Sequence, residues 1–434
     1  MRLRSALFAL GVCVVAPAAR AETLEDAVAS AFANNPTLVD ARLGVRSARE
    51  DRRQASASYM PQVDFGIDFS GRILETRQRG LFGISNNVDV LDNRTIALRA
   101  VQRLYSGGRR RAEVNQAEAG INSAQEAVRQ AEQEVLIRTI RVYADVLRDQ
   151  ANVRIRTEYA ESLAQDLRGT QRRLDVGDVT RTDLSQSQAR YARALAGLAQ
   201  ARAELEQSRA SYEAVVGYPP GELAPLDTPP APPLSLQDAT REAEAINPDL
   251  LQARHEARAA RSQVDVERSS LEPSIDLLGS LNYASDVTQE GDMSQSAQVT
   301  ARVSIPLFEG GFYQSRIRQS RIAVERADQR TESARRAVRA NVASSWYALD
   351  AAAEVVEAAH VQLGADEAAL DGVRREQGVG LRSTLDVLNA QQELLDSELG
   401  VVRAERDAYV AVFELLQSMG VLSIEALGMS RAAP

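Results

Sequence analysis

The side chains with the clearest chemical potential are two acids that recur at matching places in the chain. Asp183 closes the segment Val176–Asp183 (VGDVTRTD), and Asp386 closes Val379–Asp386 (VGLRSTLD), 203 residues later. Each segment has glycine in second place, and Arg382 adds a cation to the second segment. Because glycine adopts positive φ freely, each segment predicts a tight turn with an acid early in the following helix. The helix dipole favours an acid there, and a carboxylate with a guanidinium could form a directional ion pair.

Residue types suited to catalysis or metal binding are scarce. The sequence contains two histidines, His255 and His360, both within charged helical sequence, and one cysteine, Cys13. It contains no HExxH, no GxSxG and no phosphate-binding glycine loop. We therefore expect no enzyme activity and no metal or cofactor. The net charge of −9 and the lack of a basic run also argue against nucleic acid as a partner.

The N-terminus predicts a secretory signal peptide. Two arginines precede the apolar run of residues 6–15, and ARA at residues 19–21 is an A-x-A site, so we expect cleavage after Ala21. Cys13 would be lost with the signal, and a mature chain without cysteine is typical of a bacterial envelope. A lipidated Cys13 is the alternative, although LGV before it is a poor lipobox. No later segment approaches the ~20 apolar residues of a membrane-spanning helix.

The segments that must position the two acids form an internal duplication. LEDAVASAFANNPTL from Leu24 matches LQDATREAEAINPDL from Leu236 at an offset of 212. LYSGG from Leu104 matches LFEGG from Leu307 at an offset of 203, so the halves differ by a net deletion of nine residues. A Pro-rich linker joins them. We expect a signal peptide over 1–21, repeat 1 over 22–218, the linker over 219–234, repeat 2 over 235–420 and a tail over 421–434.

Each repeat predicts a pair of two-faced strands. Apolar side chains alternate with polar ones after a proline, as at Val63, Phe65, Ile67 and Phe69. The expected strands are at about 62–73 and 94–105 in repeat 1 and about 274–283 and 296–307 in repeat 2, with polar loops at about 75–93 and 284–295.

The strands favour a membrane barrel shared between chains. Alternating strands of about ten residues fit a barrel wall, although half of an ordinary sandwich would alternate in the same way. More than 300 residues of accompanying helical sequence favour the barrel. Four strands cannot close a barrel, and lipid does not tolerate unpaired edges. Two copies would supply roughly eight strands and three roughly twelve; a trimer is the smallest assembly with a usable lumen.

Long helices account for the rest of the chain. We expect helices over about 109–173 and 183–216 in repeat 1 and about 312–376 and 386–418 in repeat 2. Ala117, Ile121 and Ala124 begin a four-and-three spacing that is typical of a coiled-coil seam. A helix of about 64 residues would be ~96 Å long, far longer than a compact domain needs. The two acids follow the reversals between paired long helices.

Together these motifs resemble the TolC-like outer-membrane efflux proteins over essentially the whole mature length. The resemblance rests on the paired NNP and INP segments, the alternating strands, LYSGG with LFEGG, the paired VG turns, and above all GVGLRSTLDVLNAQQELL. It implies a homotrimer in which four strands per chain form a 12-stranded barrel in outer-membrane lipid, continued by a long α-helical coiled-coil barrel in the periplasm of a Gram-negative bacterium. It also implies two partners, a periplasmic adaptor (membrane fusion protein) and an inner-membrane ABC or RND transporter.

The resemblance also implies roles for the turns. The helix tips would dock the adaptor, through Val176, Gly177, Val379 and Gly380. Arg382 would bridge to Thr182 and Asp183 and hold the tips closed, and copies of Asp386 would ring the pore. Asn389 stands where the family often has a second acidic ring, so ion selectivity is open.

The expected function is a channel-tunnel that exports cargo received from a pump and an adaptor across the outer membrane. VGDVTRTDLSQSQARYA is closer to the type I secretion branch, which favours protein cargo. Drug efflux with an RND-type pump is the alternative. A soluble periplasmic coiled-coil scaffold would explain the helices but not the strand pairs.

Overall fold

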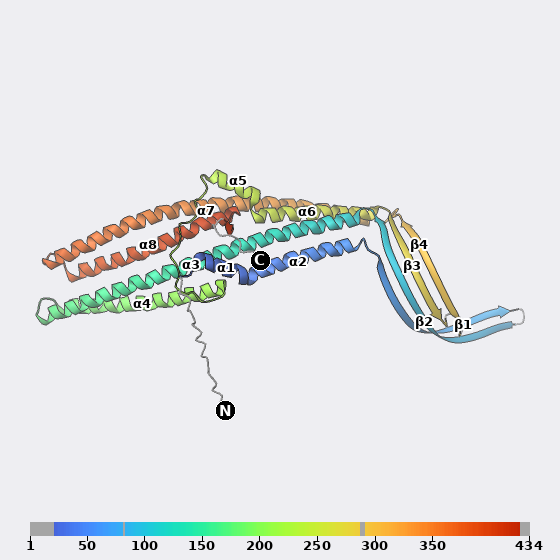
Figure 1. Ribbon diagram of the computed structural model, residues 1–434, viewed down its shortest axis with the longest axis horizontal. Helices are drawn as coiled ribbons and strands as arrows, with labels where there is room; N and C mark the ends of the chain where they lie inside the picture. The colour runs from blue at the N-terminus through green and yellow to red at the C-terminus, as the bar shows by residue number, and fades with distance from the viewer. Residues whose placement is uncertain (1–20, 81–82, 287–290, 426–434) are drawn as a thin grey trace, which may run out of the picture. The chain divides into compact units, whose positions relative to one another are not determined.

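The computed structural model describes residues 21–80, 83–286 and 291–425, so the predicted signal peptide with Cys13 lies outside the described residues. The duplicated order of helices and strands is evident in Figure 1. The elements are α1 (Leu24–Asn34), α2 (Pro36–Ala57), β1 (Gln62–Gly80), β2 (Gly83–Ser106), α3 (Arg109–Asp175), α4 (Arg181–Val216), α5 (Leu236–Ile246), α6 (Pro248–Arg268), the 3-10 turn η1 (Ser269–Leu271), β3 (Ser274–Ser285), β4 (Met293–Ser304), α7 (Phe312–Gly378) and α8 (Thr384–Met419). The expected mainly helical fold with four strands per chain is confirmed.

The chain forms two compact units, and each unit contains parts of both sequence repeats. The first unit holds the described residues before Val39, together with 132–239 and the residues from Val342 onward. The second holds Val39–Ala131 and Thr240–Asn341. The boundary between repeats is therefore not the boundary between compact units. The helices α3 and α7 continue from one unit into the other, and with 67 residues each they are ~100 Å long.

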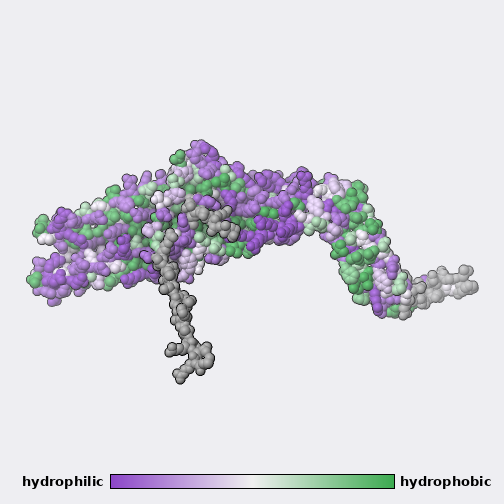
Figure 2. Space-filling model, viewed as in Figure 1, coloured by the Kyte–Doolittle hydropathy of each residue, from purple (hydrophilic) through white to green (hydrophobic). Residues whose placement is uncertain are grey.

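The second unit contains one antiparallel sheet with the strand order β1-β2-β3-β4. Phe65 on β1 lies opposite Leu98 on β2, which lies opposite Leu281 on β3. The same register places the other apolar strand residues on that face, and hydrophobic residues gather over the sheet in Figure 2. This face is uncovered, because side chains along it are 40–77% exposed: Val63, Phe65, Ile67, Ile96, Leu98, Leu281, Val299 and Val303. The predicted two-faced strands are therefore confirmed.

The hairpin of β1 and β2 is much longer than the sequence predicted. Instead of a polar loop over 75–93, the two strands stay paired from Gln62 opposite Val101 out to Gly80 opposite Gly83. Pairing of β2 with β3 ends at Arg94, so the distal part is a two-stranded ribbon. The loop prediction failed because a strand is held by backbone hydrogen bonds to its partner, which polar side chains do not prevent. In the second hairpin, strands occupy most of the expected loop over 284–295, outside residues 287–290.

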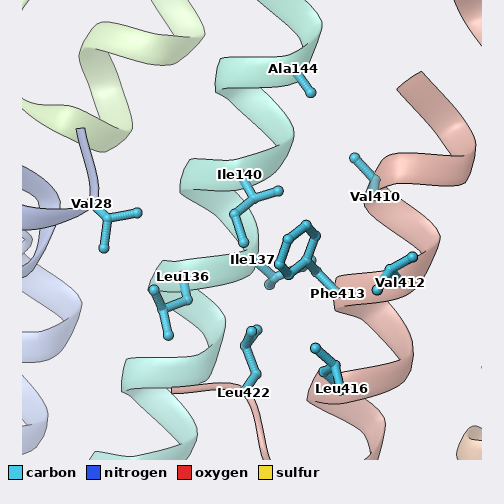
Figure 3. Packing of buried hydrophobic residues seen from close by; sticks show 10 residues of the cluster. All are labelled: Val28, Leu136, Ile137, Ile140, Ala144, Val410, Val412, Phe413, Leu416 and Leu422. Atoms are coloured by element: carbon cyan, nitrogen blue, oxygen red, sulfur yellow. The ribbon is translucent and has the colours of Figure 1, made fainter. Parts of the chain in front are cut away.

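The first unit has a hydrophobic core where α1, α3 and α8 meet. Leu136, Ile137 and Ile140 of α3 are fully buried and lie beside Phe413 of α8, with Val28 of α1 at the same cluster (Figure 3). Along α8, apolar residues spaced mostly by three, four or seven are buried: Leu388, Leu395, Leu399, Phe413 and Leu416. Among the described residues, no helix has both the length and the hydropathy needed to cross a bilayer.

The residues just after the predicted cleavage point are fixed to the Pro-rich linker. Glu22 forms an isolated parallel bridge with Leu223. Its backbone nitrogen donates to the Glu222 carbonyl at 2.7 Å, and its carbonyl accepts from the Ala224 nitrogen at 2.8 Å. The linker therefore pairs with the residues that follow the predicted cleavage point as well as connecting the two repeats.

Three tyrosines complete this contact, which we call the N-terminal clasp (Glu22, Tyr143, Tyr212, Tyr218 and Leu223–Ala224). The Glu22 carboxylate accepts from the Tyr212 hydroxyl and, at 2.6 Å, from the Tyr218 hydroxyl. The Tyr143 hydroxyl donates to the backbone carbonyls of Glu22 and Ala224 at 2.9 and 2.7 Å. Burial, with the nearby Glu22 carboxylate, raises the pKa of Tyr143 and of Tyr212, and it raises the pKa of Tyr218 to about 12.

Candidate gate at the helix tips

Each pair of long helices reverses through a short turn that contains a glycine with positive φ. Gly177 in the α3–α4 turn has φ of 80°, and Gly380 in the α7–α8 turn has φ of 81°. Side chains disfavour this left-handed region, which explains why glycine occupies the same place in both repeats. Apolar side chains are exposed at these tips: Val176 is 80% exposed, and Val379 is 73% exposed. The tips thus present apolar surface that the described residues leave uncovered.

The two acids after the turns are capping-box residues. The Asp183 carboxylate accepts from the Thr180 nitrogen at 2.9 Å and the Thr180 hydroxyl at 2.7 Å, and the Asp183 nitrogen donates back to that hydroxyl. Asp386 and Ser383 repeat the arrangement at 2.9 and 2.8 Å. Because these bonds stabilise the carboxylates, they hold the pKa of both acids below the usual range. The acids were predicted without their cap partners Thr180 and Ser383, although the S/T-x-x-D spacing signals them.

Arg382 forms an ion pair within its own hairpin. Its Nε donates to Glu376 Oε2 at 2.8 Å. No hydrogen bond or ion pair joins Arg382 to Thr182 or Asp183 in the part of the chain that the structure describes. The bridge expected between the two hairpins is therefore not made here, because a carboxylate six residues away in the same hairpin already satisfies the guanidinium.

The two helical hairpins, α3–α4 and α7–α8, contact each other a short way from their tips. Leu388 of α8 is buried in a cluster with residues of α3 and α4: Ala160, Leu163 and Ala194. Beside it, Arg190 Nη2 of α4 donates to Asn389 Oδ1 at 2.8 Å, and Gln391 Nε2 donates to Asp166 Oδ2 of α3 at 2.6 Å. Asn389 is thus placed next to a cation that sequence reasoning did not select.

Among the residues that the structure describes, the remaining chemically active side chains do not assemble into a second site. His360 Nε2 lies 3.2 Å from Glu405, and both side chains are about half exposed. Burial lowers the pKa of His255. Within residues 21–80, 83–286 and 291–425, no group of three or more His, Cys, Asp or Glu side chains could hold a metal ion.

Two-faced strands that lead into 67-residue helices, reversed at glycine turns, define an outer-membrane channel of the efflux type. The chain belongs to the outer membrane efflux protein family, whose family model matches residues 27–218 and 239–421. Proteins of this family are channels and not enzymes, and they reside in the outer membrane of Gram-negative bacteria and extend into the periplasm.

Individual relatives match over almost the whole chain. The outer membrane efflux protein BepC of Brucella suis is 32% identical, with 99% of this chain and 92% of that protein covered. The alkaline protease secretion protein AprF of Pseudomonas aeruginosa is 26% identical, with 97% and 89% covered. The crystal structure of CusC has the same fold, with a TM-score of 0.79 over 91% of both chains at 19% identity.

Proposed function

We propose that three copies of this chain form one channel-tunnel across the outer membrane. The observation that carries this proposal is the four-stranded sheet, which has an exposed apolar face and has β1 and β4 at its edges. Lipid does not tolerate unpaired edge strands, so each edge needs a partner. Pairing β4 of one copy with β1 of the next would close a barrel of roughly twelve strands around a lumen.

The long helices would continue this channel through the periplasm to a pump. α3, α4, α7 and α8 of three copies would form the helical tunnel, and the tips would receive a periplasmic adaptor that links them to an inner-membrane ABC or RND transporter. The exposed apolar residues Val176 and Val379, next to Gly177 and Gly380, support docking at the tips. Desolvation of apolar side chains would drive this contact.

The same tips would act as the gate. Three copies of Asp386 would surround the narrowing pore and attract cations. In the closed state Arg382 would exchange Glu376 for Thr182 and Asp183 of the neighbouring hairpin, and Asn389 would face the pore above the Asp386 ring. The exchange is feasible because Arg382 and Glu376 are 51% and 47% exposed, and exposed ion pairs are weak.

Protein export through a type I system is the favoured transport reaction. The segment from Val176 to Ala192 supports it, and so does the similarity to AprF, a protease secretion protein. Drug efflux is the second candidate, supported by the similarity to BepC, an efflux protein. Deleting the gene tests the choice: loss of a secreted protein supports type I secretion, whereas greater sensitivity to small toxic compounds with normal secretion supports efflux.

Cysteine cross-linking tests the shared barrel. The sequence after the predicted cleavage point has no cysteine. A chain that carries one introduced cysteine on the outer face of β1 and one on the outer face of β4 can therefore form disulfides only through these two positions. We expect covalent dimers and trimers in outer membranes for pairs such as Val63→Cys with Val303→Cys or Ile67→Cys with Val299→Cys. As a control, a cysteine in the distal ribbon of β1 combined with a cysteine in α2 should not give cross-linked chains. The proposal would be refuted if the chain stayed monomeric and was recovered in the fraction that contains no membranes.

A further inference from the structure

We infer that Arg190 is the positioning residue that ties the two helical hairpins together at the candidate gate, through its hydrogen bond to Asn389. This inference rests on the proposed function and specifies how its gate is kept closed. The two residues are 199 positions apart in the sequence, and each belongs to a different hairpin.

The polar contacts at the two turns stay within one hairpin. Arg382 is bonded to Glu376, and the two acids after the turns are bonded to Thr180 and Ser383. None of these contacts resists separation of the hairpins. Among the described residues, the polar contact between hairpins that lies nearest to the α7–α8 turn is the 2.8 Å bond from Arg190 to Asn389.

The position of this bond suits a reversible tie. Leu388, the neighbour of Asn389, is only 1% exposed and packs against α3 and α4, so α8 is already held beside its partners at this level. Asn389 itself is exposed and Arg190 is half-buried, so the bond lies at the rim of the apolar contact. A hydrogen bond from a charged donor is stronger than a neutral one, yet water can replace it when the rim opens.

Besides the bond from Gln391 to Asp166, α8 carries a further polar contact between hairpins on the same face as Asn389. Three residues beyond Asn389, Gln392 Oε1 accepts from the Tyr159 hydroxyl of α3 at 3.1 Å, and Gln392 Nε2 reaches Asp396 at 3.1 Å. Spacings of three and four place Asn389, Gln392 and Asp396 on one helical face. The bond from Arg190 to Asn389 is therefore the last polar contact in this row before the α7–α8 turn. Opening of the proposed gate would begin at this end of the row.

The strength of the bond from Arg190 should depend on whether residue 389 is asparagine or aspartate. Asparagine accepts from the guanidinium without adding charge, whereas aspartate would form a charge-assisted pair. Asn389→Asp should therefore tighten the tie, and Arg190→Met should release it while keeping an unbranched apolar stem. Arg193→Met is the matched control, because Arg193 is an exposed arginine of the same helix and no bond joins it to α8 among the described contacts.

Two measurements test the inference on the trimeric protein in detergent and in planar bilayers. Hydrogen exchange in the first turns of α8 should be about tenfold faster in Arg190→Met, which is the size expected for the loss of one bond to a charged donor, and Asn389→Ala should match it. The double variant should add nothing further, because both changes remove the same bond. Single-channel conductance should rise in Arg190→Met, and hydrogen exchange in the first turns of α8 should slow in Asn389→Asp.

Three outcomes would overturn the inference. Exchange in Arg190→Met equal to wild type would show that the bond does not hold α8. Equal effects of Arg190→Met and Arg193→Met would show a general charge effect. Additive effects in the double variant would show that the two side chains act separately. A wild-type chain that forms no conducting trimer would instead refute the proposed function, and the exchange measurement would still test the tie.

Discussion

Arg382 and Glu376 form an ion pair across the α7–α8 turn, with Nε and Oε2 2.8 Å apart. Both side chains are about half exposed, so the pair contributes little to stability and can exchange partners. Asp183, the proposed partner in the closed gate, is meanwhile occupied by Thr180. Closure of the proposed gate would therefore depend on competition between two carboxylates, Glu376 and Asp183, for one guanidinium.

Removing the competitor should favour the closed gate. We expect Glu376→Gln to lower single-channel conductance in planar bilayers, because Arg382 loses its present partner and becomes available to Asp183. Arg382→Ala and Asp183→Ala should both raise it. Arg375→Ala is the control, since Arg375 pairs with Asp371 on the exposed face of α7. Unchanged conductance in both Arg382→Ala and Asp183→Ala would reject the latch.

The capping box at the start of α4 should be needed for an ordered tip. Thr180→Ala removes the hydroxyl that both accepts from the Asp183 nitrogen and donates to its carboxylate, and such a loss costs about 1 kcal/mol of helix stability. Hydrogen exchange in the first turn of α4 should become severalfold faster. Ser185→Ala, one turn further along α4, is the matched control because its exposed hydroxyl takes no part in the cap bonds. Equal exchange in the two variants would contradict the capping role.

Acid should loosen both tips together. The cap bonds hold the pKa of Asp183 and Asp386 below the ordinary value of 3.8, so their stabilisation is complete above that value and is lost as the pH falls through the lower folded pKa. Amide exchange, corrected for its intrinsic pH dependence, should keep the first turns of α4 and α8 protected at pH 5 and unprotected well below pH 3.8. The variants Asp183→Asn and Asp386→Asn should lose this pH dependence, and its persistence in them would assign it elsewhere.

Alkali should release the N-terminal clasp. The pKa of Tyr218 is raised from 10.0 to about 12, so the clasp is fully stable below pH 10 and weakens as the pH rises through about 12. Tyr212→Phe removes one donor to the Glu22 carboxylate and should lower the midpoint of thermal unfolding already at pH 8. Tyr347→Phe, on a 62% exposed side chain, should leave the midpoint unchanged. A Tyr212→Phe midpoint equal to wild type would show that the clasp is dispensable.

Charge should be tolerated on only one face of the sheet. Val299 is 77% exposed on the apolar face, and Thr300 points to the opposite face. If the apolar face meets lipid, Val299→Arg should cost about 2–4 kcal/mol near the bilayer midplane, whereas Thr300→Arg should cost little. The amount of trimer in outer-membrane fractions measures the difference. Equal amounts of the two variants would show that lipid does not cover this face.

The sequence by itself determined the parts of the fold that depend on local periodicity. Strand alternation and the long helices follow from spacings within one segment, because side-chain direction repeats every two or every 3.6 residues. The turns at Gly177 and Gly380 follow from the conformational freedom of glycine, and the duplication follows from matching segments in the two halves. The acids Asp183 and Asp386 were located in the same way. Their caps were also readable, since a Thr or Ser three residues earlier is a local signal.

Only the tertiary structure decided which residues meet across the chain. It paired Arg382 with Glu376 and placed Arg190 against Asn389, and it built each compact unit from both repeats. It also showed that the first hairpin continues as a paired ribbon through residues whose polar composition had predicted a loop. Spacing along a segment fixes the face on which a side chain lies, but the partner of that side chain depends on which helix or strand packs opposite, and distant parts of the chain supply it.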